Sequence, residues 1–499
     1  MTKKKKQHFS IFMRMILTIF LFVTFTGCRE KESNKLRILV DLRDVDFVSS
    51  EPENLRRALK SKGELDPDTL EIELLPTEEA ERTVRLRALR TEIMSGGGPD
   101  VFLMTCNFSG WRSGRGIYRP NSGDGKDPFE QERLFSDVEK CMENHFFFPL
   151  DNFFEKAKYF DPDMILPAVL EAGKTDEGQM VLPITFTFPI AVYQKDIVQP
   201  QGELPTSWQA AADSSNRAAQ KAYGVAAWNQ FSDIFPRLSD TSGWGLTVTK
   251  EELTQRVKEA VKLCDFNLLT MMETAADNLP KLLEYDEYIN YAEKVAASPF
   301  PAEEFGGFLS ERSIDYYNIS FWSPGIYDYR WETKKCSQII EPIYNTAGGV
   351  TAGITTYASI NRNTKHPEEA FRVLDTLFCI DVQNGQGSTP EAQSDMKFQT
   401  LALRGSYGIP SRNDLLKDHT LAFQMEYSSR MSIVPGPNEE LFSEYTALRS
   451  EVTHARFYGA LDQELQTMYE ACLEAENDEE IEKIVSQSYD TMLMILAES

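Results

Sequence analysis

Residues 95–104, SGGGPDVFLM, decide how the first part of the chain folds. A glycine-rich loop that binds phosphate follows a strand and precedes a helix, where free N–H groups face the anion. Here the glycines follow a predicted helix that begins near Thr77, and they precede a predicted strand at 100–106. Glycine allows the left-handed turn that ends a helix, and Pro99 prevents the helix from continuing. The segment therefore predicts a helix stop and a buried strand, with Asp100 holding the turn.

The residues before this segment predict alternating strands and helices. Strands are expected at 36–42 and 70–75, and a helix is expected at 50–63, between Ser50 as a possible cap and Gly63. The order strand, helix, strand, helix, strand predicts a parallel sheet, because parallel neighbours need crossover connections. The second helix has an apolar stripe of Val84, Leu86, Leu89, Ile93 and Met94.

The first 28 residues predict an export signal. A basic start, MTKKKKQHFS, is followed by the apolar run MILTIFLFVTF, which is shorter than the roughly 20 residues of a membrane span. The following FTGC resembles a bacterial lipobox with Phe25 in place of the usual leucine, which implies lipidation of Cys28. The alternative is a plain cleaved signal in which Cys28 has no role. We expect a signal peptide at 1–27 and a lipidated tether at 28–35.

Length and composition limit the class of protein. The chain has 499 residues, which is too long for one ordinary core, so two or more lobes are expected. Its 52 lysines and arginines against 77 acidic residues give a net charge of −25, which repels nucleic acid phosphates. The other six cysteines contain no C-x-x-C pair and the five histidines do not cluster, so we expect no metal site and no cofactor.

Motifs of common enzyme classes are absent from the sequence. It contains no G-x-S-x-G, no H-E-x-x-H, no Walker loop and no dinucleotide fingerprint after a strand. A glycoside hydrolase needs two carboxylates at a set separation, which a sequence does not reveal. A binding protein without catalysis is therefore expected, and a lipid-anchored surface hydrolase stays as an alternative.

Several motifs in order resemble one family. They are EIMSGGGPDVFLM (92–104), MVLPITFTFPIAVYQKDIV (180–198), LPTSWQAAADSSN (204–216), YASINRNTKHPEEAFRVLDTLF (357–378), GSYGIPSRNDLL (405–416) and ENDEEIEKIVSQSYDTMLMILAES (476–499). Together, behind a lipobox, they resemble bacterial extracellular solute-binding proteins of ABC importers, in the carbohydrate-binding family 1 type. The resemblance spans nearly the whole exported chain.

The resemblance implies an α/β fold with two lobes of the periplasmic-binding-protein type, with hinge strands and a ligand cleft between the lobes. The N-terminal lobe is expected at 36–188 with 356–405. The C-terminal lobe is expected at 192–350 with 411–499. Within its first part, a helix capped by Thr249 is expected. The hinge crossings are expected at 189–191, 351–355 and 406–410.

Candidate ligand residues follow from the chemistry of sugars and from the resemblance. Apolar sugar faces stack on aromatic rings and hydroxyls bind amides and carboxylates, and the cleft of open sheets is lined by loops at the carboxyl ends of strands. Each alternative role is structural. A tryptophan can instead pack in the core, Asp44 or the nearby Asp46 can be a solvated surface acid, and Asn107 can be a turn residue at the strand end. Trp208 is expected to be structural. The expected ligand-binding residues are Asp44, Asn107, Trp111, Thr187 with Phe188, Trp228, Asn229 and Tyr445.

The predicted function is the lipid-anchored, extracellular binding component of an ABC importer. It would capture a sugar or oligosaccharide by lobe closure, act as a monomer and deliver its ligand to membrane permease subunits, as the resemblance implies. Besides the hydrolase, an adhesion lipoprotein with no small ligand is the alternative from another class.

Overall fold

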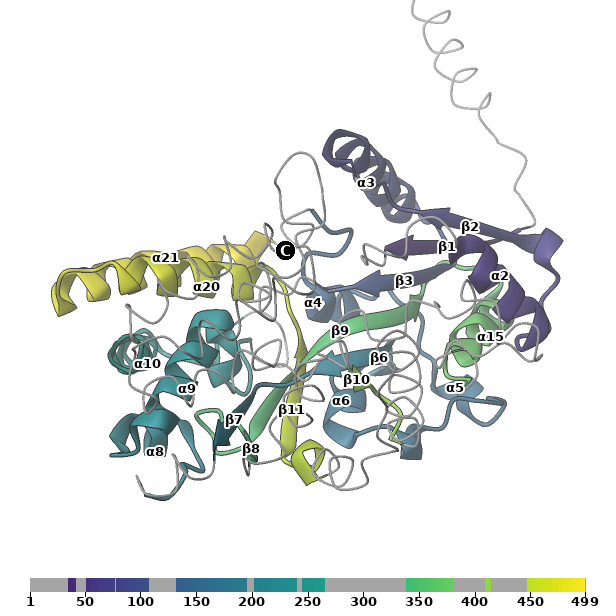
Figure 1. The fold of residues 1–499 in the computed structure, drawn as a ribbon. Helices are drawn as coiled ribbons and strands as arrows, with labels where there is room; N and C mark the ends of the chain where they lie inside the picture. Colours follow the sequence, from purple (N-terminus) through teal and green to yellow (C-terminus); the bar gives the residue numbers. More distant parts are fainter. Residues whose placement is uncertain are drawn as a thin grey trace, which may run out of the picture.

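The computed structural model describes residues 35–41, 51–76, 78–106, 132–194, 202–239, 245–264, 338–379, 382, 409–413 and 447–498. These residues form a seven-stranded mixed sheet with helices and, beside it, a second group of helices (Figure 1). Each of the two parts has its own cluster of buried apolar side chains. We call the cluster around the sheet the first core and the cluster among the helices the second core.

The first part of the chain has the alternating strand and helix order expected from its sequence. Strand β1 (Leu36–Asp41), helix α2 (Glu51–Ser61), strand β2 (Leu70–Leu74), helix α3 (Glu79–Met94) and strand β3 (Val101–Thr105) follow one another. Strand β1 pairs in parallel with β2 on one side and with β3 on the other. The predicted parallel start of the sheet is therefore confirmed.

The glycines after α3 end the helix in a left-handed turn, as predicted. Gly96 and Gly98 have φ angles of 82° and 97°. The Asn361 side chain donates hydrogen bonds to the carbonyls of Gly97 (2.9 Å) and Pro99 (2.8 Å). The Asp100 carboxylate accepts bonds from the Arg37 backbone (2.8 Å) and from Thr364 Oγ1 (2.6 Å), so its predicted structural role is confirmed.

The predicted apolar stripe of α3 was partly wrong. Val84 and Met94 are 68% and 74% exposed, while Leu86, Leu89 and Ile93 are buried. Arg82 takes the remaining buried position, because its guanidinium pairs with the buried Asp41 carboxylate at the end of β1. The helix begins after Glu78, whose carboxylate accepts bonds from the backbone N–H groups of the first turn.

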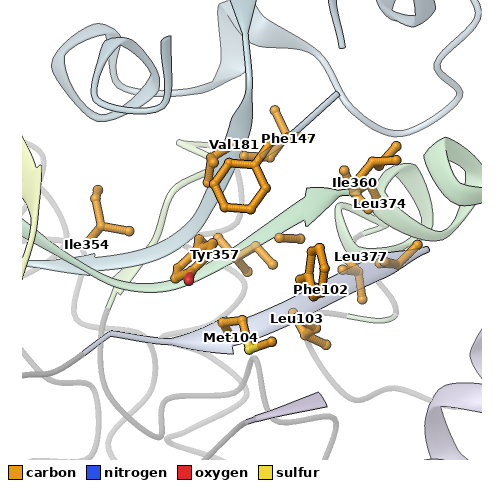
Figure 2. Close-up of a cluster of buried hydrophobic side chains, with 14 of the residues drawn as sticks. Phe102, Leu103, Met104, Phe147, Val181, Ile354, Tyr357, Ile360, Leu374 and Leu377 are labelled. Carbon is orange, nitrogen blue, oxygen red and sulfur yellow. The ribbon is translucent and has the colours of Figure 1, made fainter. Parts of the chain in front are cut away.

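Strand β9 (Val350–Ile360) is the centre of the sheet, and all eleven of its residues are buried. It pairs antiparallel with β3 and β6 (Val181–Thr187) and in parallel with β11 (Val452–Phe457). The strand order is β10-β6-β9-β3-β1-β2, with β11 added beside β9 and β10 at Ile409–Pro410. Figure 2 shows apolar side chains around β9, from neighbouring strands and from helix α15 (Pro367–Leu377).

The second core is helical in the part of the chain that the structure describes. Trp208, at the start of its first helix, is fully buried and its Nε1 donates to Glu259 (3.1 Å), which confirms a structural role. The caps Ser207 and Thr249 accept bonds from backbone N–H groups of the first turns, and the cap expected at Thr249 is confirmed. The helices are α8 (Trp208–Asp213), α9 (Arg217–Asn229), α10 (Lys250–Leu263), α20 (Ala460–Leu473) and α21 (Asp478–Glu498).

Strands carry the chain between the two cores. After β6 the chain leaves the sheet through β7 (Ile190–Gln194). It returns through β8 (Gln338–Pro342) and re-enters the sheet as β9. Strands β7 and β8 pair antiparallel with each other. A further passage leads from β11 directly into α20. The expected two-lobe α/β organisation is confirmed in these residues. The expected ligand cleft stays a prediction, and the expected lobe limits need the correction that follows.

Two stretches of the chain lie in a different place from the one expected. Residues 411–413 and 447–457 were expected in the C-terminal lobe, but Ser411 N donates to the Ile184 carbonyl (2.8 Å) and β11 joins the sheet. The reason is the unpaired edge that the first half of β9 would otherwise expose, because β3 reaches only its second half. The Tyr357 and Phe457 rings pack edge to face across this pair, 5.4 Å apart.

Short elements complete the description. They are α4 (Val138–Glu143), α5 (Asp151–Phe154), α6 (Pro167–Glu171), β4 (Lys174–Thr175), β5 (Gly178–Gln179) and the 3-10 turns Pro67–Thr69, Pro162–Met164 and Phe231–Ile234, the last called η6. None of the helices in the described ranges is long and apolar enough to cross a membrane.

Gly353 in β9 gives a first prediction about stability. A Cβ atom there would lie 1.8 Å from Cε2 of the buried Tyr458 ring, so Gly353→Ala forces the ring or the strand to move. We expect the variant to lose roughly 1–3 kcal/mol of unfolding free energy, the usual cost of overpacking. Gly97→Ala is the control, because its Cβ would meet only Glu92 O, at 3.5 Å. Urea unfolding measures both, and equal midpoints for Gly353→Ala and the parent would contradict the packing argument.

Candidate functional site

Three sheet strands end at the same edge, toward the second core. Asp41 is the last residue of β1, Cys106 directly follows β3, and Thr187 is the last residue of β6. Cys106 N donates to the Thr355 carbonyl (2.8 Å) on one side of β9, and Thr187 pairs with Gly353 on the other. All three strand ends are buried. We call this edge, with the charged groups around it, the junction.

One charged group of the junction fixes the ends of β1 and β3. Arg82 holds the Asp41 carboxylate through both of its Nη atoms, at 2.9 and 2.6 Å, and donates through Nε to the Glu132 carbonyl. Arg133 lies 3.7 Å from the same carboxylate and donates to the Cys106 carbonyl (3.3 Å). Burial lowers the pKa of Arg133, and the Asp41 charge opposes this. A buried pair of this kind holds backbone segments in place, since removing one partner leaves an uncompensated charge.

A second charged group lies where β11 leads into α20. Arg456 contacts Asp462 Oδ1 at 2.7 Å and Asp233 Oδ1 at 3.7 Å, and the Tyr458 hydroxyl donates to Asp233 Oδ1 (2.8 Å). Asp233 belongs to η6, next to α9, while Arg456 belongs to the sheet. Burial raises the pKa of Asp233 to about 7, against the lowering effects of Arg456 and the Tyr458 hydroxyl. The group therefore joins the two cores through buried, charge-assisted contacts.

Cys106 lies between these two charged groups. Burial raises the pKa of its thiol, which the Arg133 charge lowers and the Asp462 and Glu139 charges raise further. A thiol whose pKa lies above its ordinary value is protonated at neutral pH, and the thiolate is the nucleophile. The surroundings of Cys106 therefore suit packing, not nucleophilic catalysis.

The described part of the chain contains no group of three or more His, Cys, Asp and Glu side chains that could hold a metal ion. The charged side chains of the junction are instead engaged with one another. Their arrangement fixes strand ends and connects the cores.

Most of the predicted ligand residues lie outside the described residues. Asp44, Asp46, Asn107, Trp111 and Tyr445 do, as does the predicted lipidation site Cys28. Their predicted roles remain predictions.

Three predicted ligand residues fall on described elements. Thr187 is placed at the junction but is buried, as is Phe188. Trp228 and Asn229 end helix α9, and their side chains lie outside the described part. The structure thus brings Thr187 to the edge where the ends of β1 and β3 meet, and a ligand contact there stays a prediction.

The sequence analysis missed the charged groups of the junction. Arg82 could have been found, because positions 82, 86, 89 and 93 follow the spacing of one helix face and three of them are apolar. No comparable local signal marks Asp233 or Arg456, whose partners lie far away in the sequence.

Comparisons with known proteins give a limited result. Neither a scan against protein-family models nor a search of curated proteins finds a match. The chain is similar to extracellular solute-binding proteins of known structure. One is an extracellular solute-binding protein family 1 from Alicyclobacillus acidocaldarius, with 14% identity and a TM-score of 0.46, covering 92% of this chain and 98% of that one.

Two others are named for sugars. The cyclic alpha-maltosyl-1,6-maltose binding protein from Arthrobacter globiformis has 12% identity, with 92% and 98% of the two chains covered. The sugar-binding protein MalE from Xanthomonas citri has 13% identity, with 93% and 98% covered, and both TM-scores are 0.46. At these values the likeness assigns neither a ligand nor a function to this chain.

The pKa of Asp233 predicts how stability depends on pH. The Asp233 carboxyl group binds its proton more tightly in the folded protein than in the unfolded chain, where its pKa is near 3.8. The resulting stabilisation is full below that pH and is lost as the pH rises through about 7. In Asp233→Asn this contribution is absent, so we expect its unfolding free energy, relative to the parent, to rise by roughly 2 kcal/mol or more between pH 5 and 8.

Urea unfolding at several pH values measures this difference. The matched control is Asp213→Asn, which replaces an exposed aspartate at the end of α8 and should track the parent throughout. A constant difference between Asp233→Asn and the parent from pH 5 to 8 would mean that Asp233 does not titrate in this range.

Proposed function

We propose that this protein is a lipid-anchored, extracellular substrate-binding component of an ABC importer. It captures a sugar or oligosaccharide between two lobes and delivers it to permease subunits in the membrane, without turning it over. The observation that carries this proposal is the pair of separate cores connected by strands at β6–β7, β8–β9 and β11–α20. Such connections allow two rigid bodies to close on a ligand.

The position of the predicted ligand residues supports a site between the lobes. Predicted residues Asp44 and Asn107 follow the carboxyl ends of β1 and β3 by a few residues, and Thr187 ends β6. Trp228 and Asn229 end α9, whose next turn, η6, contributes Asp233 to the junction. Ligands of open α/β sheets bind beyond the carboxyl ends of strands, which supports a ligand site beyond the ends of β1, β3 and β6.

The chemistry of the junction favours binding over catalysis. Its carboxylates are held by arginines, and the Cys106 thiol has a raised pKa. Closure then depends on contacts that both lobes make to the ligand in the closed state alone, so that the ligand selects that state. The basic and apolar N-terminus with its lipobox-like FTGC supports anchoring through Cys28 on the outer face of the membrane.

A thermal-shift screen of residues 29–499 tests this function. The panel contains mono- and oligosaccharides, with amino acids, polyamines and nucleosides as controls. A ligand at 100 times its Kd stabilises the fold by roughly 2.7 kcal/mol, so we expect a clear rise in Tm with one sugar class. A flat response to all sugars would count against sugar binding and would favour an adhesion lipoprotein.

Two substitutions test the ligand site. We expect Asn107→Ala and Trp228→Ala to weaken sugar binding by roughly tenfold or more each, because each removes a hydrogen bond or a stacking ring. Calorimetric titration gives the affinity, and circular dichroism checks that both variants stay folded. Trp208→Phe is the control for a structural tryptophan and should lower Tm while leaving the affinity unchanged. Parent-like affinity in both site variants would show that the site lies elsewhere.

A further inference from the structure

Helix α4 connects the two cores through contacts that do not follow the path of the chain. Its Val138 and Met142 side chains are buried in the first core. On the same helix, Lys140 is 2% exposed, and its ammonium donates a hydrogen bond to the Leu496 carbonyl in the last turn of α21. Leu496 itself is buried in the second core. In Figure 1 the C-terminal end of α21, marked C, lies close to α4.

The end of a helix is a suitable partner for a buried ammonium. The last carbonyls of a helix have no partner within it, and they carry the negative end of the helix dipole. Taking the lysine charge out of water is costly unless such groups compensate it. The Asp137 carboxylate, which caps α4 and accepts from Lys140 N (2.9 Å), adds negative charge nearby. Burial raises the pKa of Asp137, and the Lys140 charge opposes that rise.

Two other segments of the second part of the molecule meet the same helix. The Ala460 N–H, at the start of α20, donates to the Ser136 carbonyl just before α4 (3.3 Å). The Ser239 hydroxyl lies 3.4 Å from Glu139 Oε2. A Cβ on Gly459 would lie 2.9 Å from the Ser136 carbonyl, so the two bodies are in close contact here. Helix α4 and the residue before it thus contact α20, α21 and the segment after η6.

We propose that α4 is a latch between the lobes, in which Lys140 binds the carboxyl end of α21 and holds one of the two lobe arrangements. This inference rests on the proposed lobe motion. Rotation about the connecting strands moves α4 relative to α21, and a hydrogen bond is lost once its atoms separate by about 1 Å more than its normal length. Opening or closing therefore includes release of Lys140 from Leu496. Because the Lys140 ammonium is buried, water can solvate its charge only after its hydrogen bond to Leu496 is broken. The latch therefore has two discrete states, bound and released.

Lys140→Met tests the latch without any ligand, in residues 29–499. Methionine keeps the length and apolar stem of the side chain and removes the charge. We expect amide hydrogen exchange in the last turn of α21 to become roughly ten- to a hundredfold faster, the size expected from losing a charged hydrogen bond. We also expect small-angle scattering to report a changed radius of gyration, since the balance between the lobe arrangements shifts.

Lys258→Met is the matched control. Lys258 on α10 pairs with Glu482 (2.7 Å) and Asp478 (3.2 Å) at the other end of α21, and α10 and α21 belong to the same core. This variant should speed exchange near residues 478–482 and leave the scattering curve unchanged. Lys140→Arg retains a cation and should keep a parent-like curve.

The outcomes separate the latch from a simple helix cap. Faster exchange in Lys140→Met with an unchanged scattering curve would mean that Lys140 only caps α21, and it would overturn the proposal, as would parent-like behaviour in both measurements. If Lys140→Met does not fold, Lys140→Gln, which keeps a donor without the charge, takes its place under the same criteria. A flat ligand screen with a positive latch result would refute the sugar ligand and leave the latch intact.

Discussion

The rest of the structure depends on the pairing of β9 along both of its edges. All of its residues are buried, so its backbone N–H and C=O groups have no access to water and need partners. Strand β6 supplies them on one side, and β3 and β11 share the other. The two strands that share one edge, β3 and β11, are more than three hundred residues apart in the sequence. Their pairing with β9 brings the early part of the chain, up to β6, and its last tenth into one sheet.

This pairing also decides what lies beside the sheet. Because β11 is fixed against the first half of β9, Arg456 in this strand and Tyr458 just after it reach Asp233 of η6, next to the second core. Gly353 leaves room for the Tyr458 ring, whose hydroxyl in turn binds Asp233. The buried charges at the junction are therefore a consequence of the sheet. They hold η6 and the start of α20 close to the strands on which the lobes would turn.

Two kinds of contact connect the two cores. Strands and the Arg456 group connect the two cores, and in the proposed lobe motion these strands form the hinge. Helix α4 contacts α20 and α21 and so connects the two cores through segments far apart in the sequence. A binding protein needs both a stiff pivot and contacts that are made in one state alone, since a ligand shifts an equilibrium only by its different affinity for two states. The latch proposed at Lys140 would be a contact of the second kind.

Local signals determined the early part of the fold. The strands and helices before residue 106, the helix stop at the glycines and the cap at Thr249 all followed from neighbouring residues. Each depends on backbone conformation or on side chains a few positions away, which is what a sequence displays. The buried Arg82 was within reach of the same reasoning, since it lies in line with three apolar residues of its helix.

Only the tertiary structure decided the place of β11, the burial of Asp233 and the contact of Lys140 with α21. Arg456 and Asp233 are separated by more than two hundred residues, and Lys140 and Leu496 by more than three hundred and fifty. A charged side chain in a sequence is read as exposed unless its partner is known, because a buried charge is stable only with that partner. The sequence determined the elements and the two-lobe class, and packing over long range determined which charges join the lobes.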